Sequence, residues 1–275
     1  MNIINKRCGL ERTKKAIASG RLKIGLLGGS ITASANNRAW GEIFADNLMQ
    51  LYPDISISVA NASIGVTGSD YGIFRVDHQI IAKNCDLVFV ESAVNDYEYE
   101  SSYRSRCREG LLRKLIKSGC DVVIVYTYYN KMYNDMIQGK IPPSIKEYEE
   151  LAQHYNVSSI WVGKYAFDEV MCGLLRLDEW LPDGVHPRER GSFSYAQPII
   201  EYVKSELNDK TMKKAVLAEA VNHDNWENCR AIPFNESKWK KPWILREGHH
   251  YNIRNEYLTT SAVGARLKYE FSGTW

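Results

Sequence analysis

The sequence lacks long apolar runs, and it has little excess of charge of either sign. Nowhere do about 18 consecutive apolar residues occur, as a membrane-spanning helix would need, and residues 1–20 hold no apolar core of signal-peptide length. Lysine and arginine number 35 against 33 aspartates and glutamates, whereas a dedicated nucleic-acid binder concentrates a large positive excess on one face. We therefore predict a cytoplasmic protein with no nucleic-acid or membrane partner.

Cysteine pairs at metal-binding or redox spacing are also missing. The chain has six cysteines but no C-x-x-C motif, which argues against a zinc ribbon or a thioredoxin-like site. Free cysteine is often buried, so we predict buried free thiols, and we expect neither a metal nor a cofactor. The cysteines are Cys8, Cys85, Cys107, Cys120, Cys172 and Cys229.

Short runs of apolar, β-branched residues alternate with longer amphipathic stretches. The short runs are too dense in apolar residues to have one wet face, which predicts parallel strands buried on both sides, with helices between them on both faces of an α/β sheet. Ligands of such sheets bind at the carboxyl ends of the strands. The predicted strands are residues 22–27, 55–60, 87–91, 122–127 and 158–162, and the predicted helices are residues 39–51, 71–83, 103–118, 145–154 and 188–207.

The first predicted strand runs into the stretch IGLLGGSITAS, residues 24–34. It matches neither the dinucleotide fingerprint G-x-G-x-x-G nor the phosphate loop G-x-x-x-x-G-K-[ST]. A strand–Gly–Gly–Ser–helix turn remains, in which the glycines permit tight backbone geometry and close approach of a ligand. Ser30 is then either a nucleophile at the ligand-binding edge or an ordinary helix-capping serine.

Three later stretches decide between these alternatives. They are NASIGVTGSDYG (residues 61–72), VFVESAVNDY (residues 88–97) and LPDGVHP (residues 181–187). With GGSIT they resemble, in order and spacing, the four blocks of the SGNH (GDSL-like) hydrolase family, in its G-G-S-I-T subgroup. The resemblance spans residues 22–208 and implies a flavodoxin-like three-layer α/β/α fold with a central five-stranded parallel sheet, so we predict a hydrolase domain at residues 1–208.

The resemblance also implies roles for individual residues. Ser30 matches the nucleophile, His186 the base, and Asp183 the acid that holds the imidazole in the correct tautomer. The amide of Ser30 and the side chain of Asn95 match two donors of the oxyanion hole. Asp96, next to Asn95, receives no role.

One donor position departs from the family pattern. Counted from Asn61, the usual oxyanion glycine falls on Val66, with Gly65 beside it. A backbone amide is present in either residue, but a β-branched side chain is strained where φ is positive. We therefore keep both Gly65 and Val66 as candidates.

The composition changes after about residue 207. We predict a short helix within residues 209–221, then a polar, turn-rich segment with several tryptophans, then a strand within residues 261–273 that carries Leu267, Tyr269 and Phe271 on one face. This extension, residues 209–275, either packs on the hydrolase domain or begins an accessory β domain like those beside some SGNH carbohydrate esterases.

The resemblance implies a serine esterase that removes a short acyl group, with acetyl favoured, from a carbohydrate or a similar small ester. An acyltransferase that uses the same triad on a glycan is the alternative enzyme. A catalytically inactive glycan-binding protein on the same fold is the alternative outside enzymology. The oligomeric state is left open.

Overall fold

The computed structural model describes residues 1–33, 38–97, 100–211, 214–232, 239–250 and 253–268, together with Glu270 and Ser272. The chain divides into two compact units, Met1–Cys229 and Arg230–Trp275. Across the described ranges, no helix combines the length and the apolar character that crossing a membrane requires.

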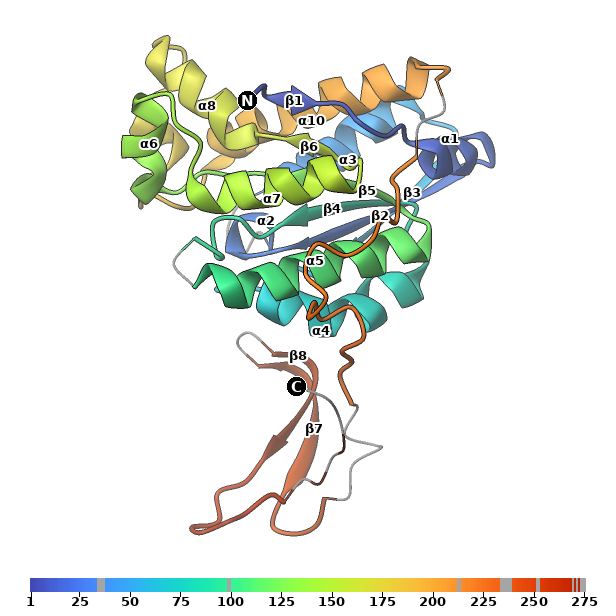
Figure 1. Ribbon diagram of the computed structural model, residues 1–275, viewed down its shortest axis with the longest axis vertical. Helices are drawn as coiled ribbons and strands as arrows, with labels where there is room; N and C mark the ends of the chain where they lie inside the picture. The colour runs from blue at the N-terminus through green and yellow to red at the C-terminus, as the bar shows by residue number, and fades with distance from the viewer. Residues whose placement is uncertain are drawn as a thin grey trace. The chain divides into compact units, whose positions relative to one another are not determined.

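A six-stranded sheet forms the centre of the first unit, with strand order β1-β6-β5-β4-β2-β3 (Figure 1). Strands β2 to β6 are parallel, and β1 pairs antiparallel with β6. The predicted α/β fold with five parallel strands in flavodoxin-like order is confirmed, and β1 adds a sixth strand too short for any periodic pattern to reveal. The strands are β1 (Ile4–Asn5), β2 (Arg21–Gly28), β3 (Ser56–Asn61), β4 (Leu87–Glu91), β5 (Asp121–Val125) and β6 (Ser158–Ile160).

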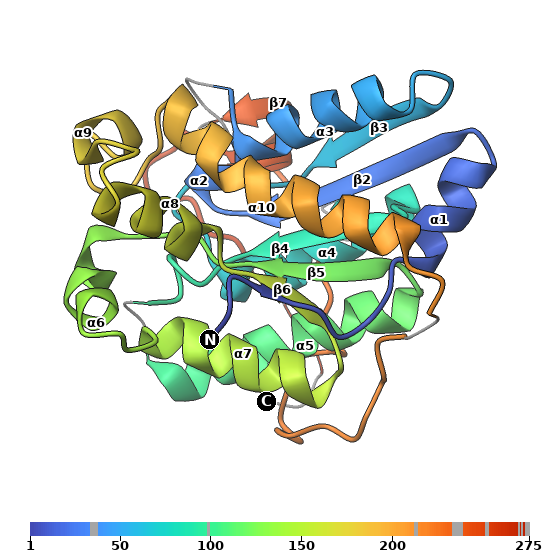
Figure 2. The same ribbon diagram turned by 90° about the horizontal axis from the view of Figure 1, so that it is seen from above.

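Helices cover both faces of this sheet (Figure 2). Helix α10 packs against α3 and α8, while α5 packs against α4 and α7. All five predicted helices are present, with ends that differ by a few residues. The principal helices are α3 (Trp40–Leu51), α4 (Ser69–Gln79), α5 (Ser101–Ser118), α7 (Pro143–His154), α8 (Val162–Met171) and α10 (Glu189–Asn208); shorter ones are α1 (Glu11–Ala18), α2 (Ser30–Ala33), η1 (Ile81–Lys83), η2 (Asn130–Met132), α6 (Tyr133–Ile137) and α9 (Leu177–Trp180).

Strand β3 corrects the prediction that every strand is buried on both sides. None of its residues is fully buried, and Val59 is 42% exposed. The reason is its place at the edge of the sheet, where it pairs with β2 alone. By contrast, all five residues of β4 are buried between β2 and β5.

The cysteine prediction is also only partly right. All six thiols are free, and four are buried, but Cys172 at the end of α8 is exposed and Cys229 is half-buried. Cys172 follows the last turn of an amphipathic helix, so its side chain faces solvent rather than the sheet.

Residues 209–229 pack on the first unit, although they follow the last helix of the predicted hydrolase domain. The helix predicted within residues 209–221 is wrong for residues 209–211 and 214–221, which form no helix. The amide of Val216, which a helix would use internally, donates instead to the backbone oxygen of Tyr155 at 2.8 Å. The amides of Val221 and Asn222 donate to the carboxylate of buried Glu109 on α5, at 2.6 and 2.8 Å. The ring of Trp226 contacts Phe74 on α4.

The second unit contains a two-stranded antiparallel hairpin, β7 (Ile244–His250) and β8 (Ile253–Thr259), in which Ile244 opposes Thr259. The strand predicted within residues 261–273 is wrong for residues 261–268, which form a turn and unpaired chain. Tyr269 and Phe271 lie outside the described residues. The alternation of apolar and polar residues misled the prediction, because a strand also needs a partner. In this unit the paired strands are β7 and β8, which lie upstream of residue 261.

Candidate active site

The carboxyl edge of the sheet brings together segments that are distant in the sequence. The chain passes from β2 outward to β3 and then returns to β4 on the other side of β2, so the strand order reverses between β2 and β4. Ligands of open α/β sheets bind at such a switch point. Gly28 at the end of β2 pairs with Glu91 at the end of β4, and Ser30 begins α2 just beyond.

Ser30, His186 and Asp183 form a hydrogen-bonded row at this edge. His186 Nε2 lies 2.7 Å from Ser30 Oγ, and His186 Nδ1 lies 2.7 Å from Asp183 Oδ2. In the tautomer that carries its proton on Nδ1, the imidazole donates to Asp183 and accepts from the Ser30 hydroxyl. The structure therefore brings together the three residues that the sequence placed in one site.

A tight loop between α9 and α10 presents Asp183 and His186. Asp183 Oδ1 accepts from the backbone amides of Val185 and His186, at 2.9 and 2.7 Å, while Gly184 has a φ of +81°. A Cβ at Gly184 would lie 2.6 Å from the Asn130 side chain, so both the backbone conformation and the available space favour glycine here.

The hydrogen bonds in this loop determine the charge of Asp183. Partial burial alone would raise its pKa, but the amide and imidazole of His186 and the amide of Val185 outweigh that effect and lower the pKa to about 2. Asp183 is therefore an anion at neutral pH. It faces an imidazole that would become positive on accepting a proton.

The candidate oxyanion donors lie beside Ser30. Ile64 N donates to Gly28 O at 3.0 Å, which places the residues after β3 alongside the Gly28–Ser30 turn. The Asn95 side chain lies against Gly29, where an added Cβ would fall 2.0 Å from Asn95 Oδ1. We expected the glycine pair to admit a ligand; at Gly29 it also makes room for Asn95.

The backbone of Val66 lies in the left-handed region, which favours glycine. Its φ is +65°, and its side chain is 74% exposed. A β-branched residue in the left-handed region is a true outlier, and such strain costs of the order of 1–3 kcal/mol. The chain therefore retains this conformation near Ser30 at an energetic cost. The choice between the amides of Gly65 and Val66 as donor stays open.

Asp96, which the sequence left without a role, is a buried anchor. Its Oδ1 accepts from the amide of Ser69 at 2.9 Å and from Arg104 Nη1 at 3.0 Å. Its Oδ2 accepts from Arg108 Nε at 3.1 Å and from the hydroxyl of Tyr148 at 3.2 Å. The i, i+4 spacing of the two arginines on α5 was the available sequence signal.

This anchor joins the two loops that carry candidate oxyanion donors. Asp96 directly follows Asn95, and Ser69 lies three residues after Val66. A Cβ at Gly68 would lie 2.1 Å from Asp96 Oδ1, so the turn after Val66 can approach the carboxylate only through glycine. The positions of both loops thus depend on one buried side chain.

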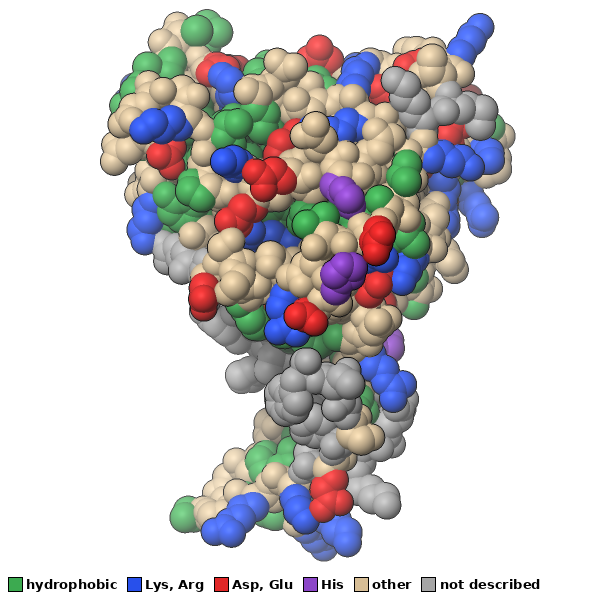
Figure 3. Space-filling view, in the orientation of Figure 1, with side chains coloured by type: hydrophobic (Ala, Val, Ile, Leu, Met, Phe, Trp, Pro, Cys, Tyr) green, Lys and Arg blue, Asp and Glu red, His purple; other side chains and the backbone are tan. Residues whose placement is uncertain are grey.

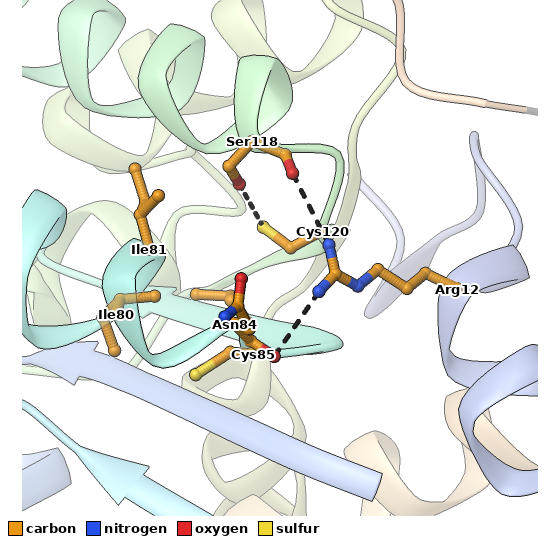
Figure 4. A pocket seen from close by; sticks show the side chains of 8 residues that line it. Arg12, Ile80, Ile81, Asn84, Cys85, Ser118 and Cys120 are labelled. Atoms are coloured by element: carbon orange, nitrogen blue, oxygen red, sulfur yellow. Dashed lines mark hydrogen bonds between the residues drawn. The ribbon is translucent and has the colours of Figure 1, made fainter. Parts of the chain in front are cut away.

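A hollow lies at the opposite edge of the sheet. A small pocket of about 100 Å³ lies at the amino ends of β4 and β5 (Figure 4). In it Arg12 donates to the carbonyl oxygens of Asn84 and Ser118, and Ser118 Oγ lies 3.3 Å from Cys120 Sγ. The pocket therefore lies at the amino edge of the sheet, opposite the carboxyl edge where Ser30 lies.

On the face in Figure 3, lysine and arginine are dispersed among aspartate and glutamate without a continuous basic surface. Within the part of the chain that the structure describes, no group of three or more histidine, cysteine, aspartate or glutamate side chains could hold a metal ion.

Comparison with known proteins finds similarity among solved structures only. No protein-family model and no curated protein matches the chain. A two-domain esterase (CEX) active on acetylated mannans is 24% identical with a TM-score of 0.69, over 82% of this chain and 61% of its own. The same esterase co-crystallised with mannopentaose is 26% identical, with a TM-score of 0.69 over 82% of this chain and 60% of that one. This chain therefore spans about three fifths of the length of that esterase.

A second similar structure is Axe2, an acetylxylan esterase from Geobacillus stearothermophilus. It is 19% identical with a TM-score of 0.53, over 69% of this chain and 95% of its own. Two of its variants, described as catalytic mutants, replace an aspartate and a histidine that are three residues apart in its chain. These similarities show that the chain has the α/β fold of solved carbohydrate esterases.

Proposed function

We propose that the protein is a serine esterase that removes a short acyl group, with acetyl favoured, from a carbohydrate. The observation that carries the proposal is the continuous row from Ser30 through His186 to Asp183 at the carboxyl edge of the sheet. A nucleophile, a base within hydrogen-bond reach and an acid that orients the base are the parts that acyl transfer requires.

In the proposed reaction, Ser30 Oγ attacks the ester carbonyl while His186 Nε2 takes the hydroxyl proton. Asp183 stabilises the resulting imidazolium, which then protonates the leaving alcohol. His186 next removes a proton from water, which attacks the acyl-enzyme and restores the Ser30 hydroxyl. The negative oxygen of each tetrahedral intermediate is stabilised by the Ser30 amide, by the amide of Gly65 or Val66, and by the Asn95 side chain.

The solvent exposure of the His186 and Asp183 side chains supports a substrate in which the ester is attached to a polymer. The side chains of His186 and Asp183 are 49% and 54% exposed. An ester attached to a large glycan can reach such a row, whereas a deep tunnel would admit only small free esters. The acetylated mannans and acetylxylan of the similar esterases point to the same class of substrate.

The same exposure favours hydrolysis over acyl transfer. Water reaches an exposed acyl-enzyme freely, and a transferase must exclude water to let a sugar hydroxyl compete. A transferase would instead produce acetylated acceptor sugar when one is added in excess.

The deciding experiment compares wild type with Ser30→Ala, using p-nitrophenyl acetate, acetylated mannan oligosaccharides and a fluorophosphonate probe. Ser30→Ala should reduce kcat by about 10⁶-fold, the loss typical of removing a serine nucleophile, and should abolish labelling. Ser102→Ala on the exposed face of α5 is the matched control and should behave as wild type. If wild type is inert toward all three reagents, the enzyme assignment fails and a glycan-binding role takes its place.

A further inference from the structure

A carboxyl group that the proposed mechanism does not use lies next to the nucleophile turn. Glu91 is the last residue of β4 and is 0% exposed. It pairs across the sheet with Gly28, two residues before Ser30. A buried ionisable group at this distance from developing charge requires a physical explanation.

The hydrogen-bond partners of the Glu91 carboxyl are all neutral groups. Glu91 Oε2 lies 2.9 Å from Thr32 Oγ1 and accepts from the amide of Gly29 at 3.3 Å. Glu91 Oε1 lies 2.9 Å from Thr127 Oγ1, just beyond β5. Trp40 Nε1 in turn donates to Thr32 Oγ1 at 3.3 Å. One side chain therefore joins the end of β4, the segment after β5 and both sides of Ser30.

The nucleophile turn is shaped to fit this carboxyl. A Cβ at Gly28 would lie 2.8 Å from the backbone oxygen of Glu91, 2.9 Å from Thr32 Oγ1 and 3.0 Å from Glu91 Oε2. Any larger residue at that position would push the turn away from the carboxyl. The first glycine of the pair thus makes room for Glu91, as the second does for Asn95.

The surroundings of Glu91 disfavour its charge. Burial, before any other effect, raises the pKa of Glu91, and the negative charge of nearby Asp96 raises it further. The hydrogen bonds from Thr127, Thr32 and the Gly29 amide oppose these effects without cancelling them.

Among the described residues, the groups named as contacts of Glu91 on neighbouring elements carry no positive charge that would hold it as an anion. Buried Tyr195 on α10 lies near Glu91, and burial raises the pKa of that phenol, so it is neutral. The hydrogen-bond partners of Glu91 on α2 and after β5 are hydroxyls. In the loop after β4, Arg104 and Arg108 form ion pairs with Asp96. The positive charge of these arginines is therefore directed at Asp96 and not at Glu91.

We propose that Glu91 is a positioning residue that holds the Gly29–Ser30 turn as a neutral, protonated acid. In that form its Oε1–H donates to Thr127 Oγ1, while Oε2 accepts from the Gly29 amide and from Thr32. Every polar atom of the carboxyl is satisfied, and no negative charge opposes the oxyanion that forms beside Ser30. The role of the turn in catalysis rests on the proposed function; the protonation of Glu91 does not.

The main test uses Glu91→Gln, which mimics the neutral acid, and follows thermal unfolding against pH. Because folding raises the pKa of Glu91, wild type loses stability as pH rises from the ordinary carboxyl value of 4.5 toward the folded value. Glu91→Gln has no such proton to lose, so its melting temperature should exceed that of wild type by a margin that widens with pH. Glu150→Gln, at an exposed site on α7, is the matched control and should show no widening.

Infrared and kinetic measurements complete the test. Wild type at neutral pH should show the carbonyl stretch of a protonated carboxyl, which Glu91→Gln removes and Glu150→Gln retains. Glu91→Gln should keep kcat close to wild type, whereas Glu91→Ala should lower kcat about 100-fold, the loss typical of a slightly misplaced catalytic group, with KM nearly unchanged.

The opposite results would overturn the proposal. A Glu91→Gln protein that is less stable than wild type at every pH and lacks the infrared difference would show that Glu91 is an anion. A Glu91→Gln protein as inactive as Glu91→Ala would show that its charge is needed. Because unfolding and infrared spectra do not depend on esterase activity, they decide the protonation state even if the enzyme assignment fails.

Discussion

The loop at residues 182–187 and the segment at residues 91–96, where β4 ends and the following loop begins, both supply carboxyl groups to one edge of the sheet, in opposite surroundings. Asp183 in the loop is half-exposed, and backbone amides and an imidazole lower its pKa to about 2. Glu91 on β4 is buried among neutral donors, and its pKa is raised. The same functional group thus provides a permanent charge in one region and an uncharged support in the other.

Asp96 shows that burial alone does not decide this difference. It is as buried as Glu91 and only five residues away, yet it faces two arginines. Breaking a buried ion pair by removing one partner leaves an uncompensated charge, which costs far more than losing an exposed pair. The partners that the fold brings to a buried carboxyl therefore determine what it can do.

The largest effect should come from removing the charge in the loop. Asp183→Asn keeps an oxygen for the amides of Val185 and His186, but its NH₂ group then faces His186 Nδ1 and favours the wrong tautomer. We expect kcat on p-nitrophenyl acetate to fall about 10⁴-fold, with the modest loss of melting temperature that removal of a half-exposed carboxylate causes. A loss below tenfold would show that Asp183 does not orient the imidazole.

The stability of the protein at acid pH provides a second test of the difference between Asp183 and Glu91. Because folding lowers the pKa of Asp183, its stabilising contribution is present above the ordinary value of 3.8 and is lost as pH falls toward about 2. Folding raises the pKa of Glu91, so its contribution to the pH dependence of stability has the opposite sign. Asp183→Asn should therefore unfold with a weaker pH dependence between these two values than wild type, as measured by circular dichroism.

Next in size is the buried anchor on the β4 side. Asp96→Ala leaves Arg104 and Arg108 buried without this carboxylate and should lower the free energy of unfolding by about 3–5 kcal/mol. Urea denaturation measures this change. Asp168→Ala removes the exposed pair with Lys164 and should change little. Equal effects of the two variants would contradict the anchor.

A smaller effect, confined to catalysis, should follow from Asn95→Ala. Loss of one oxyanion donor should reduce kcat by about 10²–10³-fold, with KM and melting temperature nearly unchanged. Asn134→Ala, on the exposed face of α6, is the control. If KM rises and kcat stays constant, Asn95 binds substrate and does not stabilise the transition state.

The smallest effect concerns the strained loop. Val66→Gly relieves left-handed strain, partly offset by the greater flexibility of unfolded glycine, and should stabilise the protein by about 1 kcal/mol. Val59→Gly, in the extended edge strand β3, has no such strain to relieve and should destabilise it. If Val66→Gly also destabilises the protein, the side chain of Val66 makes contacts that outweigh the strain.

The sequence alone predicted the features that depend on neighbours along the chain. Dense apolar runs marked the five parallel strands, and the family resemblance named Asp183 and His186, three residues apart in one short loop, as acid and base. The strand order then followed from the α/β pattern and the family resemblance. Such features are local, because turn geometry and runs of apolar residues are decided within a few residues.

Only the tertiary structure decided the rest. The exposure of β3, the hairpin upstream of the predicted tail strand and the packing of residues 209–229 on α5 depend on which surfaces meet. The difference between Glu91 and Asp96 is of the same kind. Glu91 ends β4 and Asp96 lies five residues further on, but threonines from other elements bind Glu91 and arginines from α5 bind Asp96. The free energy of a buried charge is set by partners that folding brings together, and the order of residues along the chain does not reveal them.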